Sequence, residues 1–232
     1  NHLLAMAAAA KAYDLLPIGI VRGFHGQELP SATLLECAAL GMQLVYVSRE
    51  EYQRKEDPAY LQQLQVQYPG VYIIPEGGNN EAGLSGAAAI ARYIPQDADL
   101  VMAAIGTGTT FAGVRNGLDS RTGMLGFPVM KGGEYLQQEI AERLQTTGTN
   151  WALATGYHFG GFARYNDELL AFMNDFYKKH HVPLDFVYTG KMLYGILDMI
   201  RRKEISGKKH VIAIHTGGLQ GNRSIGHLLS YS

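Results

Sequence analysis

The chain has 232 residues, of which 47% are hydrophobic and 18% are charged, and its formal net charge is −1. This size allows a substantial buried core, whereas the near-neutral charge argues against a nucleic-acid-binding surface, which needs an excess of basic residues. The only cysteine, Cys37, excludes a disulfide framework and a cysteine-based metal cluster, and no apolar run reaches the roughly 18 residues of a membrane span.

Helical patterns alternate with short β-branched runs along the chain, and we predict the following elements from them. The predicted helices are residues 2–14, 31–40, 50–56, 58–68, 81–94, 110–117, 133–147 and 167–180. The predicted strands are residues 16–23, 43–48, 70–78, 98–110 (a strand that continues into a loop), 124–130 and 210–218. Cys37 falls in an apolar helical pattern and is expected in the core.

This order of elements predicts βαβ units and a parallel sheet covered by helices. In such sheets, ligands bind beyond the carboxyl ends of the strands. Three glycine-rich loops are expected at those ends, namely "EGGNN" (76–80), "GTGTT" (106–110) and "HTGG" (215–218). Three loops at corresponding positions indicate one shared cleft.

The loop "GTGTT" consists of Gly106, Thr107, Gly108, Thr109 and Thr110. Its glycines allow close approach to the backbone, and the N–H groups that open the following helix favour an anion. The loop lacks the Lys-Ser/Thr pair of a nucleotide-binding P-loop, and a phenylalanine follows it where a dinucleotide fingerprint needs glycine or alanine. A single phosphate, held without a metal on an organic cofactor, fits the loop better than a nucleotide.

Six motifs together resemble the D-cysteine desulfhydrase / 1-aminocyclopropane-1-carboxylate deaminase family. They are "NHLLAMAAAA", "IPEGGNN", "IGTGTTFAG", "GYHFGGFAR", "VYTGKMLYG" and "IHTGG", and they extend from residue 1 to the end of the chain. The resemblance implies an α/β, two-domain, parallel-sheet fold of the tryptophan-synthase-β type (fold type II), with pyridoxal 5′-phosphate (PLP) as cofactor.

The resemblance also assigns roles to individual residues. The loop from Gly106 to Thr110 matches the family's phosphate cup. Asn1 matches the asparagine of a Ser-Asn-His motif, which bonds the cofactor's 3′-oxygen, and Thr216 matches a hydroxyl that faces the pyridine nitrogen. Tyr157 and Tyr188 match two tyrosines that face the substrate, so they are the expected catalytic residues.

One element of the family is missing from the printed sequence. The family's Schiff-base lysine precedes the Ser-Asn-His motif, and none of Lys11, Lys55, Lys131 and Lys191 lies in a comparable context. We therefore expect an N-terminally incomplete protein that is inactive as the 232-residue chain. Residues 1–13 read as a helix with Asn1 as N-cap, not as a signal peptide, so a cytoplasmic location is expected.

The resemblance favours β-elimination over ring opening. The deaminase branch has Glu after the tyrosine of "YxGK" and an apolar residue before the last Gly-Gly, whereas this chain has Thr189 and Thr216. A neutral hydroxyl leaves the pyridine nitrogen unprotonated, which suits elimination of a leaving group. We expect a desulfhydrase acting on a small amino acid such as D-cysteine. The alternatives are a 1-aminocyclopropane-1-carboxylate deaminase and a non-catalytic fragment that binds a phosphorylated ligand.

The expected organisation follows from the same resemblance. Residues 1–75 would form a smaller, mobile domain and residues 76–232 a larger PLP-binding domain, both incomplete. The expected partner is a small amino-acid substrate, with no nucleic acid and no membrane, in a protein that is a homodimer. No metal is expected, because the adjacent His180 and His181 point to different faces of a helix.

Overall fold

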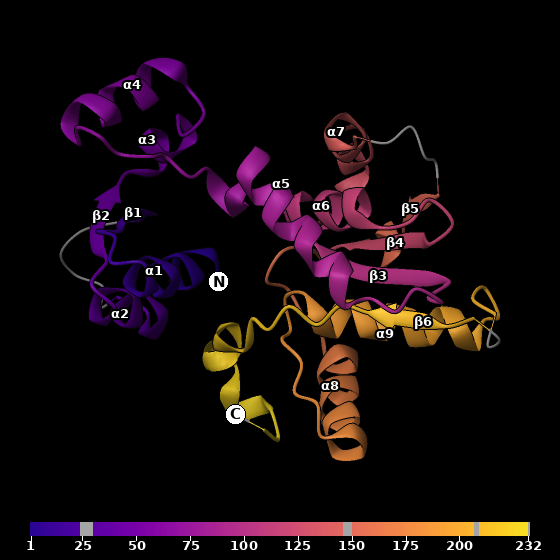
Figure 1. The fold of residues 1–232 in the computed structure, drawn as a ribbon. Helices are drawn as coiled ribbons and strands as arrows, with labels where there is room; N and C mark the ends of the chain where they lie inside the picture. The colour runs from indigo at the N-terminus through magenta and orange to yellow at the C-terminus, as the bar shows by residue number, and fades with distance from the viewer. Residues whose placement is uncertain (24–29, 146–149, 207–208, 232) are drawn as a thin grey trace. The chain divides into compact units, whose positions relative to one another are not determined.

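The protein is described by a computed structural model that covers residues 1–23, 30–145, 150–206 and 209–231 (Figure 1). The chain divides into two compact units, Asn1–Glu76 and Gly77–Ser232. Within the described residues, every helix is too short or too polar to cross a membrane.

The described part of unit 1 contains a two-stranded parallel sheet and four helices. Its strands are β1 (Ile18–Arg22) and β2 (Gln43–Val47), which pair in parallel with Ile18 opposite Gln43. Its helices are α1 (His2–Ala12), α2 (Ala32–Ala39), α3 (Arg49–Gln53) and α4 (Pro58–Gln67). The buried cluster of this unit consists of Ala7, Cys37 and Met42, which confirms the expected core position of Cys37.

Short polar side chains begin three of these helices. Ser31 accepts a hydrogen bond from the N–H of Leu34, and Ser48 accepts one from the N–H of Glu51. Asp57 caps α4, where a proline takes the first helical position. Each cap satisfies a backbone N–H group that has no partner inside the helix. Asn1 holds the N-cap position of α1, but its side chain forms no capping bond.

Unit 2 is built on a four-stranded parallel sheet in the order β5-β4-β3-β6. The central strand β3 (Leu100–Ile105) pairs with β4 (Gly123–Pro128) on one side and with β6 (Val211–Ala213) on the other, and β5 (Trp151–Leu153) pairs with β4. Because all four strands run in the same direction, the loops that follow them meet at one edge of the sheet.

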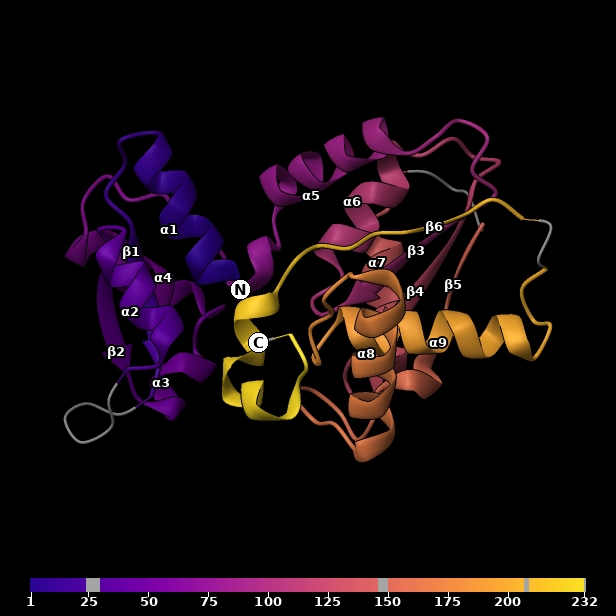
Figure 2. The ribbon, with the colours of Figure 1, turned by 90° about the horizontal axis from the view of Figure 1, so that it is seen from below.

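Helices cover both faces of this sheet. They are α5 (Glu81–Ala88), α6 (Thr109–Gly117), α7 (Leu136–Arg143), α8 (Asp167–His180) and α9 (Thr189–Arg201). Figure 1 shows α6 on one side of the strands and α9 on the other, and Figure 2 shows the same layers from below.

Alternate residues of β3 pack in opposite directions, as a strand with two buried faces requires. Val101, Ala103 and Ile105 belong to the cluster that includes residues of α6 and α7. Met102 belongs instead to the cluster that includes Met192 of α9. The near-continuous apolar sequence of this strand therefore reflects burial on both faces.

The predicted elements differ from the structure in several places. The predicted strand 70–78 is irregular and ends in a 3-10 turn, η1 (Glu76–Gly78), because Pro75 lacks an N–H donor and Gly77 and Gly78 have positive φ. The predicted helix 81–94 is α-helical to Ala88 and continues as a 3-10 segment, η2 (Ala89–Tyr93). The short strand β5 was not predicted.

Candidate functional site

The loop between β3 and α6 forms a cup of backbone groups. Gly108 is the N-cap of α6 and has a left-handed φ of +85°. Because a glycine cap has no side chain, the first N–H groups of α6 are left to bind an external acceptor, and the helix dipole favours an anion there. A Cβ at this position would lie 3.0 Å from Ile140 Cγ1 and 3.1 Å from Arg143 Nη1. Both the conformation and the space therefore require glycine.

Threonine hydroxyls line the same loop. The Oγ1 atoms of Thr107 and Thr109 are 3.1 Å apart, which is a hydrogen-bond distance, and Thr109 is buried. A Cβ on Gly77 would lie 2.5 Å from Thr107 Oγ1, so η1 packs directly on the cup. The loop 76–80 was expected at the end of a strand. It follows no strand, yet it contacts the cup.

Arg143, in the last turn of α7, is hydrogen-bonded to the cup. Its Nη1 donates to the carbonyl oxygen of Thr107 at 2.6 Å, and its Nη2 donates to Glu139 Oε2 at 3.0 Å. Asn116 of α6 in turn donates to the carbonyl oxygen of Arg143 at 3.1 Å. The guanidinium therefore stabilises the loop through a carbonyl group and leaves the N–H groups of the loop unoccupied by this contact. Sequence reasoning missed this residue, because no motif links positions 36 residues apart.

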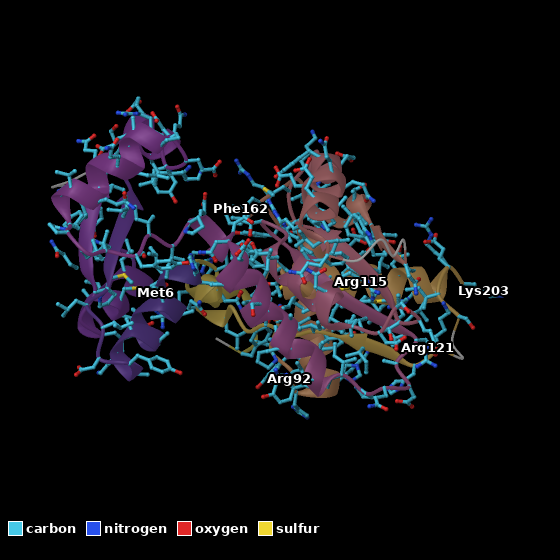
Figure 3. The ribbon with its side chains drawn as sticks, turned by 45° about the horizontal axis from the view of Figure 1, so that its top comes forward. Met6, Arg92, Arg115, Arg121, Phe162 and Lys203 are labelled. Carbon is cyan, nitrogen blue, oxygen red and sulfur yellow. The ribbon has the colours of Figure 1, made fainter. Side chains whose placement is uncertain are left out.

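Tyr188 lies beside the cup. A Cβ on Gly106 would be 3.3 Å from Tyr188 Cε1 and 3.5 Å from its hydroxyl oxygen. The ring of Phe162, which is labelled in Figure 3, meets the Tyr188 ring edge-on with centroids 6.1 Å apart. The structure thus places Tyr188 beside the loop 106–110 and adds Phe162 as a neighbour that the sequence did not single out. That Tyr188 faces the substrate stays a prediction.

A buried carboxylate sets the position of Tyr188. Asp185 Oδ1 accepts hydrogen bonds from the N–H groups of Val187 and Tyr188 at 3.0 and 2.7 Å. Its Oδ2 accepts from the N–H and the hydroxyl of Thr189 at 2.8 and 2.7 Å. Asp185 therefore satisfies the free N–H groups at the start of α9, and Thr189 is committed to this network.

Tyr157 lies at the other end of α9. It ends a 3-10 turn, η4 (Thr155–Tyr157), and its hydroxyl donates to Asp198 Oδ2 at 2.8 Å. Burial and the Asp198 carboxylate both raise the pKa of Tyr157. Asp198 follows Tyr188 by ten residues, which is about 15 Å along a helix axis. The structure therefore does not bring the Tyr157 hydroxyl to the cup.

The two remaining predicted cofactor residues lie in different units. Thr216 is exposed in the loop that follows β6, and β6 pairs with β3, so this loop leaves the sheet beside the cup. The neighbouring His215 holds the loop, because its Nδ1 accepts from the N–H of Gly217 at 3.1 Å. Asn1 belongs to unit 1 and is not placed relative to the cup.

Comparisons with known proteins agree with this geometry. Residues 1–217 match the family described as pyridoxal-phosphate dependent enzyme. Two curated relatives, both named "Putative 1-aminocyclopropane-1-carboxylate deaminase", are 29% identical to this chain. The one from Thermotoga maritima covers 95% of this chain and 75% of its own length, and the one from Pyrococcus furiosus covers 95% and 72%.

Solved structures show the same fold. A crystal structure described as an ACC deaminase homologue has a TM-score of 0.80 at 24% identity, over 98% of this chain and 73% of its own. Threonine deaminase isoform 2 from Solanum lycopersicum has a TM-score of 0.60 at 18% identity, over 99% and 71%. The expected α/β parallel-sheet fold of fold type II PLP enzymes is confirmed.

The residues at the cup fit the phosphate of PLP. One tetrahedral anion needs several converging N–H donors and close approach to the backbone, and the glycine-capped start of α6 supplies both. The threonine hydroxyls of the loop add donors that carry no charge. A cofactor held in this way requires no metal ion at its phosphate.

Proposed function

Because the chain belongs to the family of pyridoxal-phosphate-dependent enzymes, we propose that, together with the Schiff-base lysine of that family, it eliminates the β substituent of a small amino acid. The proposed substrate is D-cysteine, which with one water gives pyruvate, ammonia and sulfide. The observation that carries the proposal is the cup before α6, with the Tyr188 ring lying against Gly106. An anion site and a phenol hydroxyl are thereby adjacent.

The proposal keeps the cofactor contacts that the resemblance implies. Gly106, Thr107, Gly108, Thr109 and Thr110 would bind the phosphate. Thr216 would face the pyridine nitrogen and Asn1 the 3′-oxygen. When bound, PLP withdraws electrons from the Cα of the amino acid and so makes its proton removable.

Tyr188 is the tyrosine that the geometry supports as the catalytic one. Its hydroxyl would orient the substrate and donate a proton to the departing sulfur. Asp185 would keep the ring in place by holding the backbone on both sides of it. Tyr157, whose hydroxyl bonds Asp198, would act on the site through the packing of α9 rather than through a proton.

The neutral side chain at position 216 favours elimination over ring opening. The hydroxyl of Thr216, facing the pyridine nitrogen, would not keep that nitrogen protonated, and the bound cofactor would then be a weaker electron sink. Elimination requires less electron withdrawal by the cofactor than ring opening does, because the electron pair leaves with the sulfur. The second candidate is a 1-aminocyclopropane-1-carboxylate deaminase, and the names of the curated relatives favour it.

A substrate screen on the purified holoenzyme separates these candidates. It follows pyruvate, sulfide and 2-oxobutyrate separately, with D-cysteine, L-cysteine and 1-aminocyclopropane-1-carboxylate as substrates. In a holoenzyme that carries the family's Schiff-base lysine, we expect equal amounts of sulfide and pyruvate from D-cysteine, and from the 232 residues alone we expect neither product. If 2-oxobutyrate forms and sulfide does not, the deaminase is the correct assignment. If PLP binds and none of the three products forms, the protein is a binding protein for a phosphorylated ligand.

Two tyrosine variants test the proposed role of Tyr188 in the same assay. Tyr188→Phe should lower kcat by roughly 10²-fold, which is typical for the loss of a general acid. Tyr157→Phe should lower kcat less and should lower the thermal midpoint, because it breaks a half-buried bond. The exposed Tyr93 supplies the control variant Tyr93→Phe. Equal losses in the two test variants would contradict the assignment.

The proposal also includes the remaining expectations from the resemblance. Unit 1 would correspond to the smaller, mobile domain of the family and unit 2 to its PLP-binding domain. The protein would be a cytoplasmic homodimer. Sedimentation analysis of the holoenzyme tests the dimer, and a monomer at micromolar concentration would contradict it.

A further inference from the structure

The loop that follows η4 has an unusual backbone. Phe159 and Ala163 have positive φ angles of 51° and 53°, and between them Gly160 and Gly161 have φ of 90° and 121°. Residues with a side chain adopt this region only when their surroundings hold them there. The loop 158–164 must therefore be fixed by contacts outside itself.

Lys191 supplies the strongest of these contacts. It is 1% exposed, and its Nζ donates to the carbonyl oxygens of His158 at 2.9 Å and Gly161 at 2.7 Å. Both acceptors belong to the loop, one on each side of Phe159. The Phe159 ring also packs edge-on against Tyr194 of α9, with centroids 4.9 Å apart. Helix α9 therefore holds the loop by an ammonium group and by an aromatic contact.

A lysine in this place is costly for the fold. Burial of the ammonium group lowers the pKa of Lys191 to about 8, and the nearby Asp185 offsets this only in part. An apolar side chain of similar length would avoid this cost. The ammonium group adds two charge-assisted hydrogen bonds, which fix the orientation of two carbonyl groups of the loop.

The loop held in this way carries Phe162 to the site. Phe162 directly follows Gly161, whose carbonyl oxygen Lys191 binds. Its ring is 56% exposed and faces the Tyr188 ring, which in turn lies on Gly106 of the cup. Lys191 lies in the first turn of α9, three residues after Tyr188, which is the N-cap of that helix.

We propose that Phe162 is a specificity-determining residue, an apolar wall of the substrate pocket beside Tyr188, and that Lys191 is the positioning residue that holds it there. This inference rests on the proposed function, because it takes the space beside Tyr188 as the place of the substrate's β substituent. A phenyl wall offers no hydrogen bond. It therefore favours small substrates with a soft or apolar β substituent, such as a thiol or chloride, over those with a hydroxyl.

The positioning role is tested on the apoprotein by hydrogen–deuterium exchange. Lys191→Met should speed exchange in residues 158–164 by at least about tenfold and leave β3 and β4 unchanged. Lys191→Gln, which keeps N–H donors, should restore part of the protection. The control is Lys179→Met on α8, where an exposed lysine pairs with Asp175 at 2.7 Å. Unchanged exchange in the loop, or equal acceleration throughout unit 2, would overturn the positioning role.

The specificity role is tested on the holoenzyme with Phe162→Ala, a substitution at an exposed position. It should raise KM for D-cysteine by about tenfold, the effect of losing apolar contact with a small substrate, and change kcat by less than about twofold. The preference for β-chloro-D-alanine over D-serine should fall in the same variant. Tyr93→Ala, at another exposed aromatic residue, is the control. An unchanged KM and an unchanged preference would overturn the role of Phe162.

A binding measurement separates failure of this inference from failure of the proposed function. The affinity of the holoenzyme for unreactive D-alanine is read from the change in cofactor absorbance. If the wild type releases no sulfide but Phe162→Ala still weakens D-alanine binding, then the reaction assignment is wrong and the proposed role of Phe162 is supported. If D-cysteine is turned over and Phe162→Ala changes neither the D-alanine affinity nor KM, then only the proposed role of Phe162 is wrong.

Discussion

Two buried charged residues on either side of Tyr188 act on different parts of the site. Asp185 is bonded to the N–H groups that begin α9, and Lys191 is bonded to carbonyl groups of the loop 158–164. Each charge therefore neutralises backbone dipoles rather than pairing with the other in a direct ion pair. This arrangement fixes the two chain segments that meet at Phe162 and Tyr188.

The lowered pKa of Lys191 gives stability a pH dependence. Its pKa is about 8 in the folded protein and near 10.5 in the unfolded chain, so the unfolded chain binds more protons between these values. The free energy of unfolding should therefore rise from about pH 8 to pH 10.5 through this group, by on the order of 1–3 kcal/mol.

The variant Lys191→Met isolates this contribution from that of the tyrosines. Urea unfolding of both proteins at a series of pH values should show the wild type gaining stability relative to the variant above pH 8. A difference that stays constant, or that shrinks with rising pH, would show that Lys191 keeps an ordinary pKa in the fold.

Single residues of the site differ in how well a sequence can predict them. Gly108 and Tyr188 lie in local patterns, a glycine-rich turn before a helix and a tyrosine before a helix, so their neighbourhood in the chain carries the information. Arg143 acts on the cup through space, and its local sequence gives no sign of it. Gly77 lies in the glycine-rich loop 76–80, which the sequence predicted to share a cleft with the cup, and its close approach to Thr107 agrees with that. Phe162 stands in the motif "GYHFGGFAR", but its contact with Tyr188 depends on the left-handed backbone before it.

At the scale of elements, the proposed phosphate site depends on the start of α6. The helix presents N–H groups because its N-cap is a glycine, and Ile140 and Arg143 leave no room for a larger residue. We expect Gly108→Ala to lower PLP affinity by at least about tenfold, because the added Cβ displaces donors that must converge. The same variant should lose about 1–2 kcal/mol of stability from the left-handed φ.

A second glycine serves as a matched control for that strain. Gly70 has a similar φ of +79° in unit 1, with nothing within 4 Å of an added Cβ. Gly70→Ala should lose comparable stability and bind PLP normally in a spectroscopic titration. If Gly108→Ala binds PLP as tightly as Gly70→Ala does, the loop does not hold the phosphate.

The elements that sequence reasoning placed well are those with a strong period and a clear start. Ser31, Ser48 and Asp57 mark helix starts that the structure confirms. The segment 70–78 was predicted as a strand from its apolar run, but a strand also needs a partner, and this segment crosses from one unit to the other. The three residues of β5 are too few to form a pattern, and their pairing with β4 defines them.

At the scale of the whole molecule, the two units have unequal cores. Unit 1 has a two-stranded sheet and a small buried cluster around Cys37. Unit 2 has clusters on both faces of a four-stranded sheet. Two strands alone are marginally stable, and burial of apolar area is the main stabilising contribution.

We therefore expect unit 1 to open without unit 2 in native-state hydrogen exchange. Amides of β1 and β2 should exchange through an opening that costs on the order of 2 kcal/mol less than the opening that exposes β3 and β4. Saturating PLP should slow exchange at β3 and α6. Exchange of all four strands through one shared opening, with the same dependence on urea, would contradict this expectation.

The cup of backbone amides has a practical consequence for handling the protein. Donors that carry no formal charge recognise the shape of a tetrahedral oxyanion and not the molecule attached to it. Phosphate and sulfate buffers would therefore compete with the cofactor during purification, and a preparation made in them would contain less PLP than one made in a chloride buffer. The choice of buffer would thus determine the fraction of the protein that carries bound PLP.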